Sequence, residues 1–113
     1  MNPDHIVEMF AGFGPVTVRR IFGGFGIYAD GTIFALALRG VIYLKADAET
    51  IPAFEREGRG PFTYAAKRGK RTVMSYWQLP DRLYDDADEL ADWARTALAV
   101  ARRAKAPKPR RRR

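Results

Sequence analysis

Two tight turns divide a long run of strand-favouring residues, and they constrain the fold more than any other feature of this sequence. Asp30-Gly31 and Arg39-Gly40 interrupt the stretch from Phe25 to Lys45. An Asp-Gly pair between two strands is typical of a type I′ turn, because both central residues of that turn need a positive φ. The sequence therefore predicts three consecutive antiparallel strands, over residues 25–29, 32–38 and 41–45.

The residues before this meander predict a short helix and a further strand start. Asn2 or Asp4 can cap a helix that runs to Met9, and a cluster of glycine and proline ends it. Valines then alternate with polar residues until the glycines of Phe22–Gly26 interrupt the pattern. We expect a kink or bulge at these glycines, because a phosphate-binding loop would need a helix N-terminus after the strand.

The second half of the chain predicts a helix, a hairpin and a long helix. Asp47 is a good N-cap for a helix of about ten residues that ends at Gly58. Residues 62–66 and 72–79 predict a hairpin with a cationic tip. Over 85–105, apolar residues recur at helical spacing between an acidic first turn and a basic last turn. The order of helix, three- or four-stranded meander, helix, two strands and helix predicts an α+β fold, a two-layer sandwich with one antiparallel sheet covered by helices.

The positive charge of the chain is concentrated at its C-terminus. The formal net charge is +7, from 20 Lys and Arg against 13 Asp and Glu, yet eight of these cations follow residue 101 without an acid. The Pro/Lys/Arg segment 106–113 cannot bury apolar surface, so we predict a domain over 1–105 followed by a disordered tail. A membrane span needs roughly 18 apolar residues, and neither such a run nor a signal peptide is present, which predicts a cytoplasmic protein.

The reactive side chains argue against an enzyme. The sequence has no cysteine and a single histidine, His5, which excludes thiol nucleophiles and thiolate metal sites. Ser75 and the carboxylates have no spacing typical of a catalytic group. Acids near the start of the last helix are spread around its axis, so we interpret them as complementing the helix dipole. We predict a non-enzymatic protein with no metal and no cofactor.

Two groups of residues are candidates for binding. A flexible polycation attracts polyanions by releasing their counterions, so the cations of the hairpin tip and the tail are candidate phosphate contacts. The alternatives are a solvated turn that protects a strand edge and a solubilising end. The candidate nucleic-acid-binding residues are Lys67, Arg68, Lys70, Arg71, Lys108, Arg110, Arg111, Arg112 and Arg113.

The aromatic residues of the strands form the second group. Tyr28, Tyr43, Tyr64, Tyr76 and Trp77 could stack on bases or another planar ligand, but strand alternation places Tyr76 and Trp77 on opposite faces. We interpret most of the five as core packing, and keep Tyr64 and Tyr76 as candidates for a ligand or partner groove.

Four segments match, in order, the segments of one known domain. They are residues 21–36, 41–47, 54–64 and 74–80, the last of which reads Met-Ser-Tyr-Trp-Gln-Leu-Pro. Over about residues 4–102 the chain thereby resembles the N-terminal domain of the TfoX/Sxy family. The resemblance implies a helix-covered sheet similar to secretion-chaperone-like folds. It also implies transcriptional control, because full-length TfoX/Sxy proteins are co-activators of competence genes with the cyclic-AMP receptor protein.

We therefore expect a regulatory or binding module with a protein partner in transcription, non-specific contact with nucleic acid through the tail, and no membrane association. One departure from the family is that its full-length regulators carry a second, helical domain where this sequence has the arginine tail. The alternative is a small-ligand-binding or protein-adaptor domain with no nucleic-acid role.

Overall fold

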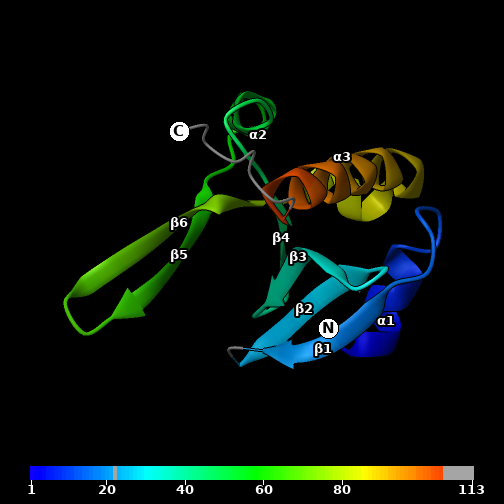
Figure 1. Cartoon of the computed structure of the whole chain (residues 1–113), viewed down its shortest axis with the longest axis horizontal. Helices are drawn as coiled ribbons and strands as arrows, with labels where there is room; N and C mark the ends of the chain where they lie inside the picture. Colours follow the sequence, from blue (N-terminus) through cyan, green and yellow to red (C-terminus); the bar gives the residue numbers. More distant parts are fainter. Residues whose placement is uncertain (22, 106–113) are drawn as a thin grey trace, which may run out of the picture.

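A computed structural model describes residues 1–21 and 23–105 and confirms the expected order of elements (Figure 1). The strands form one open antiparallel sheet of order β1-β2-β3-β4-β6-β5. No helix in the described ranges is long and apolar enough to cross a membrane. The elements are α1 (Pro3–Met9), β1 (Thr17–Ile21), β2 (Gly24–Ala29), β3 (Thr32–Leu38), β4 (Val41–Lys45), α2 (Ile51–Arg56), β5 (Pro61–Ala66), β6 (Gly69–Gln78), a 3₁₀ turn η1 (Asp81–Asp85) and α3 (Ala87–Lys105).

Both turns of the expected meander are confirmed. Asp30 and Gly31 have φ angles of 50° and 78°, and Arg39 and Gly40 have φ angles of 51° and 78°. Positive φ at two successive residues is the geometry of a type I′ turn, whose twist matches that of the flanking strands. The chain therefore reverses tightly at both positions, and β2, β3 and β4 pair in sequence order.

The glycine-rich segment after β1 forms a hairpin, so the expected kink or bulge within one strand is wrong. β1 pairs along its whole length with β2, and Gly23 adopts a φ of 76° in the turn between them. Phe22 lies outside the described residues. Gly24 is needed for close packing, because a Cβ there would lie 2.4 Å from the carbonyl oxygen of Ala37 in β3. The register shift between β2 and β3 lies farther along, after Ile27.

Helix α2 has six residues instead of the expected ten. The Asp47 side chain accepts hydrogen bonds from the backbone N–H groups of Glu49 and Thr50, at 3.0 and 3.2 Å. Asp47 therefore stabilises the turn before α2 and does not cap the helix. Helix α3 also begins later than expected, because the preceding residues form η1, and the Asp86 side chain accepts a hydrogen bond from a backbone N–H in its first turn.

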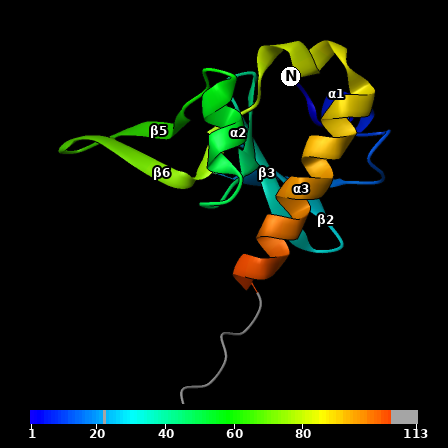
Figure 2. The same ribbon diagram turned by 90° about the horizontal axis from the view of Figure 1, so that it is seen from above.

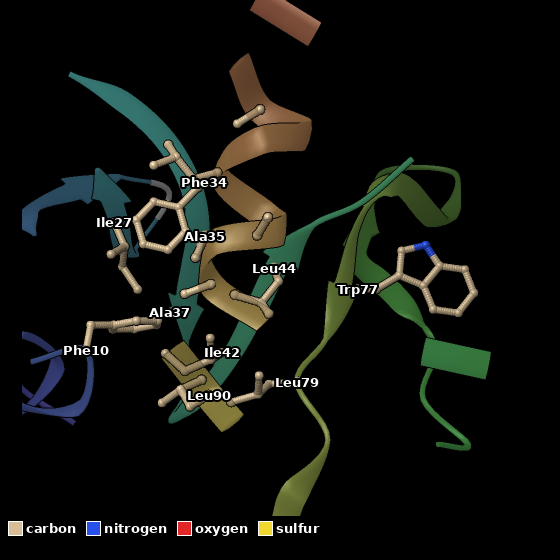
Figure 3. Close-up of a cluster of buried hydrophobic side chains, with 14 of the residues drawn as sticks. Phe10, Ile27, Phe34, Ala35, Ala37, Ile42, Leu44, Trp77, Leu79 and Leu90 are labelled. Carbon is tan, nitrogen blue, oxygen red and sulfur yellow. The ribbon is translucent and has the colours of Figure 1, made fainter. Parts of the chain in front are cut away.

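The core lies between α3 and one face of the sheet, which we call the inner face (Figures 2 and 3). Phe34 of β3 is fully buried and meets Phe10, just after α1, edge-on at 5.6 Å between ring centroids. The apolar stripe expected on α3 is buried except for Ala87 at its start, and its many alanines allow the helix to lie close to the sheet. The labelled core residues in Figure 3 are Phe10, Ile27, Phe34, Ala35, Ala37, Ile42, Leu44, Trp77, Leu79 and Leu90.

Strands β5 and β6 leave the sheet as a two-stranded arm, residues 61–75 (Figure 1). Only the last three residues of β6 pair with β4. Pro61 of β5 pairs with Trp77 of β6, but the next residue, Phe62, pairs with Val73. The three residues of β6 between Val73 and Trp77 therefore have no partner in β5. The Trp77 indole N–H donates a hydrogen bond of 2.9 Å to the carbonyl of Met74 in this bulge. A bulge of this kind bends a strand, and here it turns the arm away from the helices.

Arg82 of η1 links both later helices by ion pairs. Its guanidinium lies 2.7 Å from the carboxylates of Glu57, after α2, and Glu89, in α3. Hydrogen bonds from Arg82, and then from the Trp93 indole, lower the pKa of Glu89 from 4.5 to about 2. These groups are at the surface, so the pairs are screened by salt.

The Arg82 cluster is expected to give a pH-dependent stability in acid. A carboxyl whose pKa is lower in the folded chain stabilises the fold above its unfolded pKa, and this contribution is lost as the pH falls through the folded pKa. We therefore expect the melting temperature of the wild-type protein to fall more steeply than that of Glu89→Gln as the pH is lowered from about 4.5 to 2. Thermal unfolding followed by circular dichroism at a series of pH values measures this difference, and parallel curves would contradict it.

Candidate functional site

The face of the sheet opposite the helices, which we call the outer face, carries four tyrosines. Tyr76 lies there because its neighbour Trp77 is buried in the inner core, as alternation predicts. By the same alternation Tyr28 and Tyr43 lie on the outer face, and both are half-buried. The interpretation of most of the five aromatic residues as core is therefore wrong, since only Trp77 belongs to it.

Tyr64 and Tyr76 line one groove between the sheet and the arm, which we call the outer groove. The groove has a volume of about 440 Å³. Tyr64 is 47% exposed, so its ring is open to solvent. Apart from the two tyrosines, the walls are apolar. The lining residues are Ile21, Ile33, Leu36, Phe62, Tyr64, Val73 and Tyr76. The arrangement makes a binding role chemically reasonable, and that role stays a prediction.

Three aromatic rings form a continuous row from the sheet onto the arm. The centroids of Tyr43 and Phe62 are 5.0 Å apart, and those of Phe62 and Tyr64 are 5.9 Å apart with an angle of 25° between the rings. Phe62 and Tyr64 are two residues apart in β5 and so point to the same side of the arm. We call Tyr43, Phe62 and Tyr64 the aromatic row.

A glycine forms part of the structure beneath the groove. A Cβ on Gly26 would lie 2.8 Å from Cδ1 of Ile21 and 2.9 Å from Cδ1 of Ile33. The absence of a side chain thus allows these two isoleucines, which line the groove, to close over β2. Sequence reasoning missed Ile21, Ile33 and Leu36, although apolar residues on a strand face away from the helices were the available signal.

The four expected tip cations are separated by the hairpin. Lys67 and Arg68 lie in the turn, whereas Lys70 and Arg71 belong to β6, which begins earlier than predicted. Arg71 lies opposite Tyr64 in the register and so shares its face of the arm, while Lys70 lies opposite Ala65 on the other face. All four are exposed, and none forms an ion pair with another residue in the ranges that the structure covers.

The cations at the end of the chain are only partly described. Arg102 and Arg103, at the end of α3, bind Asp30 at 3.3 Å and Asp47 at 2.9 Å. These two are therefore paired with the folded body. The tail candidates Lys108, Arg110, Arg111, Arg112 and Arg113 lie outside the described residues.

The strands contain no acidic residue. All 13 Asp and Glu lie in the helices, in η1 or in connections. The charged residues of the strands are Arg19, Arg20, Lys45, Lys70 and Arg71. The strands therefore carry positive charge alone, whereas the helices and η1 hold eight acids together with six Lys and Arg. Summing the charge along the chain, and not for each element, concealed the absence of acids from the strands.

Cations also lie against rings of the sheet. The Lys45 ammonium is 4.9 Å from the centroid of Tyr76, and the Arg19 guanidinium is 5.5 Å from that of Tyr28. Burial lowers the pKa of Lys45 and raises the pKa of Tyr76. Within residues 1–21 and 23–105, no three His, Asp or Glu side chains are grouped to hold a metal ion.

Comparison with known proteins identifies relatives over most of the chain. The family model of the TfoX N-terminal domain matches residues 8–101. The chain is 24% identical over 94 residues to protein Sxy of Escherichia coli (strain K12). That alignment covers 83% of this chain and 44% of Sxy, so the chain spans less than half the length of this curated relative.

Proposed function

Because the chain belongs to the TfoX N-terminal domain family, we propose that it is a non-enzymatic regulatory domain of the cytoplasm that connects a protein partner in transcription with nucleic acid. The observation that carries this proposal is the separation of charge, in which the strands hold cations and no acids. Strands with cations and no acids attract a polyanion, and acids beside an apolar pocket on the helix side can attract a cationic protein surface, so the domain could take two different partners at once. The helix layer would contact the protein, and the cations the nucleic acid.

The helix layer offers an apolar pocket with acidic residues at its edge. The pocket lies between α2 and α3 and has a volume of about 310 Å³. The rings of Phe54 and Trp93 pack edge-on in its wall, with 5.1 Å between centroids, and two acids, Glu49 and Asp92, line it together with one cation, Lys45. Such a site fits an apolar anchor flanked by cations on the partner.

The protein half of the proposal is tested with the cyclic-AMP receptor protein as the probe, since the family resemblance implies it. We expect Glu49→Lys to weaken binding of the purified receptor at least about tenfold, because like charges across an interface are strongly unfavourable. Glu8→Lys makes the same charge change on α1, which is outside the pocket, and should leave the affinity unchanged. Equal affinities of the two variants in surface plasmon resonance would contradict this half.

The nucleic-acid half rests on the tail, residues 106–113, together with the tip of the arm. Five cations of the tail would release counterions from DNA, so its removal should reduce the slope of log affinity against log salt by up to about 4. Mobility-shift titrations of duplex DNA between about 50 and 200 mM salt, with and without residues 106–113, measure this slope. A flat salt response, or an unchanged affinity after truncation, would contradict the proposal that the tail tethers the domain to nucleic acid.

A further inference from the structure

We propose that the outer groove binds single-stranded nucleic acid, with unpaired bases on the aromatic row and phosphates near the cations of the sheet. The inference deepens the nucleic-acid half of the proposed function by naming the form of nucleic acid and the surface that takes it. It does not need the tail, because every residue that carries it lies on β1, β3, β4, β5 or β6.

The rings of the aromatic row favour an unpaired base. Phe62 and Tyr64 are nearly parallel, at 25°, and Tyr64 leaves about half of its surface open to solvent. Every base has an apolar π-face, and sheets with exposed aromatic residues bind single strands by stacking on such faces. In a duplex these faces are already covered by neighbouring base pairs, so a duplex cannot use the row.

The charges around the groove favour a polyanion over the other occupants of an apolar groove. Arg71 shares the face of Tyr64, and Arg19 and Lys45 lie against rings of the same sheet. No strand contributes an acid that would repel phosphate. A second copy docked through this face would place the same cations opposite one another, which is unfavourable. A chain of phosphates with stackable bases is the occupant that matches both properties.

The first test compares a single strand with a duplex, using the full chain. Fluorescence anisotropy would follow a labelled oligothymidylate of about 12 nucleotides and a blunt duplex of the same length. We expect the single strand to bind at least about tenfold more tightly. Tyr64→Leu and Phe62→Leu should each reduce this affinity by about fivefold or more and leave duplex binding unchanged, because leucine keeps the apolar surface and removes the stacking face. Unfolding midpoints of the variants would verify that both fold.

The second test uses two neighbouring cations on opposite faces of the arm. Arg71→Gln should weaken single-strand binding and reduce the salt slope by about 0.7, the value for one phosphate contact on a single strand. Lys70→Gln makes the same charge change on the other face and should leave the preference for single strands unchanged. Equal losses in the two variants would overturn the proposal.

Two further outcomes would also overturn it. If single strand and duplex bind equally and the row variants change neither, the groove has no role, while the tail tether remains supported by its own titration. If the chain forms a dimer in solution that Tyr64→Leu dissociates, the groove is occupied by a second copy.

Discussion

Gly24→Ala is expected to lower the free energy of unfolding by about 3 kcal/mol, at the upper end of the range for overpacked cores. The new Cβ would lie 2.4 Å from the carbonyl oxygen of Ala37 and 2.6 Å from Cδ2 of Leu38. The oxygen belongs to the backbone of the central strand β3, so it can move only if the pairing of β2 with β3 is distorted. Urea unfolding followed by circular dichroism measures the loss.

Gly26→Ala is the matched control for this substitution. Its Cβ would also be crowded, at 2.8 Å from Ile21, 2.9 Å from Ile33 and 3.0 Å from the ring of Tyr28, but these contacts are to side chains and none is to backbone. Side chains can move more easily than a paired strand, so we expect a loss of about 1 kcal/mol. Equal losses at the two glycines would show that the approach of β2 to β3 is not the constraint inferred here.

Phe34→Ala is expected to lower the free energy of unfolding by about 3–5 kcal/mol, which is typical of a fully buried phenylalanine. Phe34 is 0% exposed and contacts Phe10 and Phe13, with centroids 5.6 and 5.1 Å away. These contacts connect β3 to the segment after α1, so amide hydrogen exchange should accelerate first in residues 3–13.

Phe62→Ala removes the same side chain from the arm and serves as the comparison. Phe62 is half-buried and packs on Tyr43 and Tyr64, away from the main core. We expect its effect on global unfolding to be about 1 kcal/mol. Comparable losses for the two phenylalanines in urea would contradict the division between core and arm.

Local signals in the sequence account for the parts of the fold that were predicted correctly. The meander followed from Asp30-Gly31 and Arg39-Gly40, because a type I′ turn is determined by its own two residues. Helix α3 followed from the spacing of its apolar residues. The function of Gly24 did not follow, because the atom that it must avoid belongs to Ala37, in the next strand.

The candidate site shows the same limit. Alternation correctly separated Tyr76 from Trp77. The apolar residues of the outer face were a signal in the sequence, but the groove itself was not predictable, because it forms only where β6 lies between β4 and β5 and its bulge directs the arm over that face. Arg71 and Lys70 could be assigned to opposite faces only after the register with Tyr64 and Ala65 was known.

The backbone joins the arm to the sheet over a short stretch, through three residue pairs between β4 and the end of β6 and a hydrogen bond from the Ala46 N–H to the carbonyl of Ser75. A longer or shorter hairpin tip would therefore leave the packing beneath α3 unchanged. Residues added in equal number to the two strands at Lys67-Arg68 would lie beyond Tyr64 and Arg71, so the pairing of these two residues and the face that they share would not change. The hairpin is thus the part of this molecule in which evolution can extend a binding surface in steps while the hydrophobic interior stays the same.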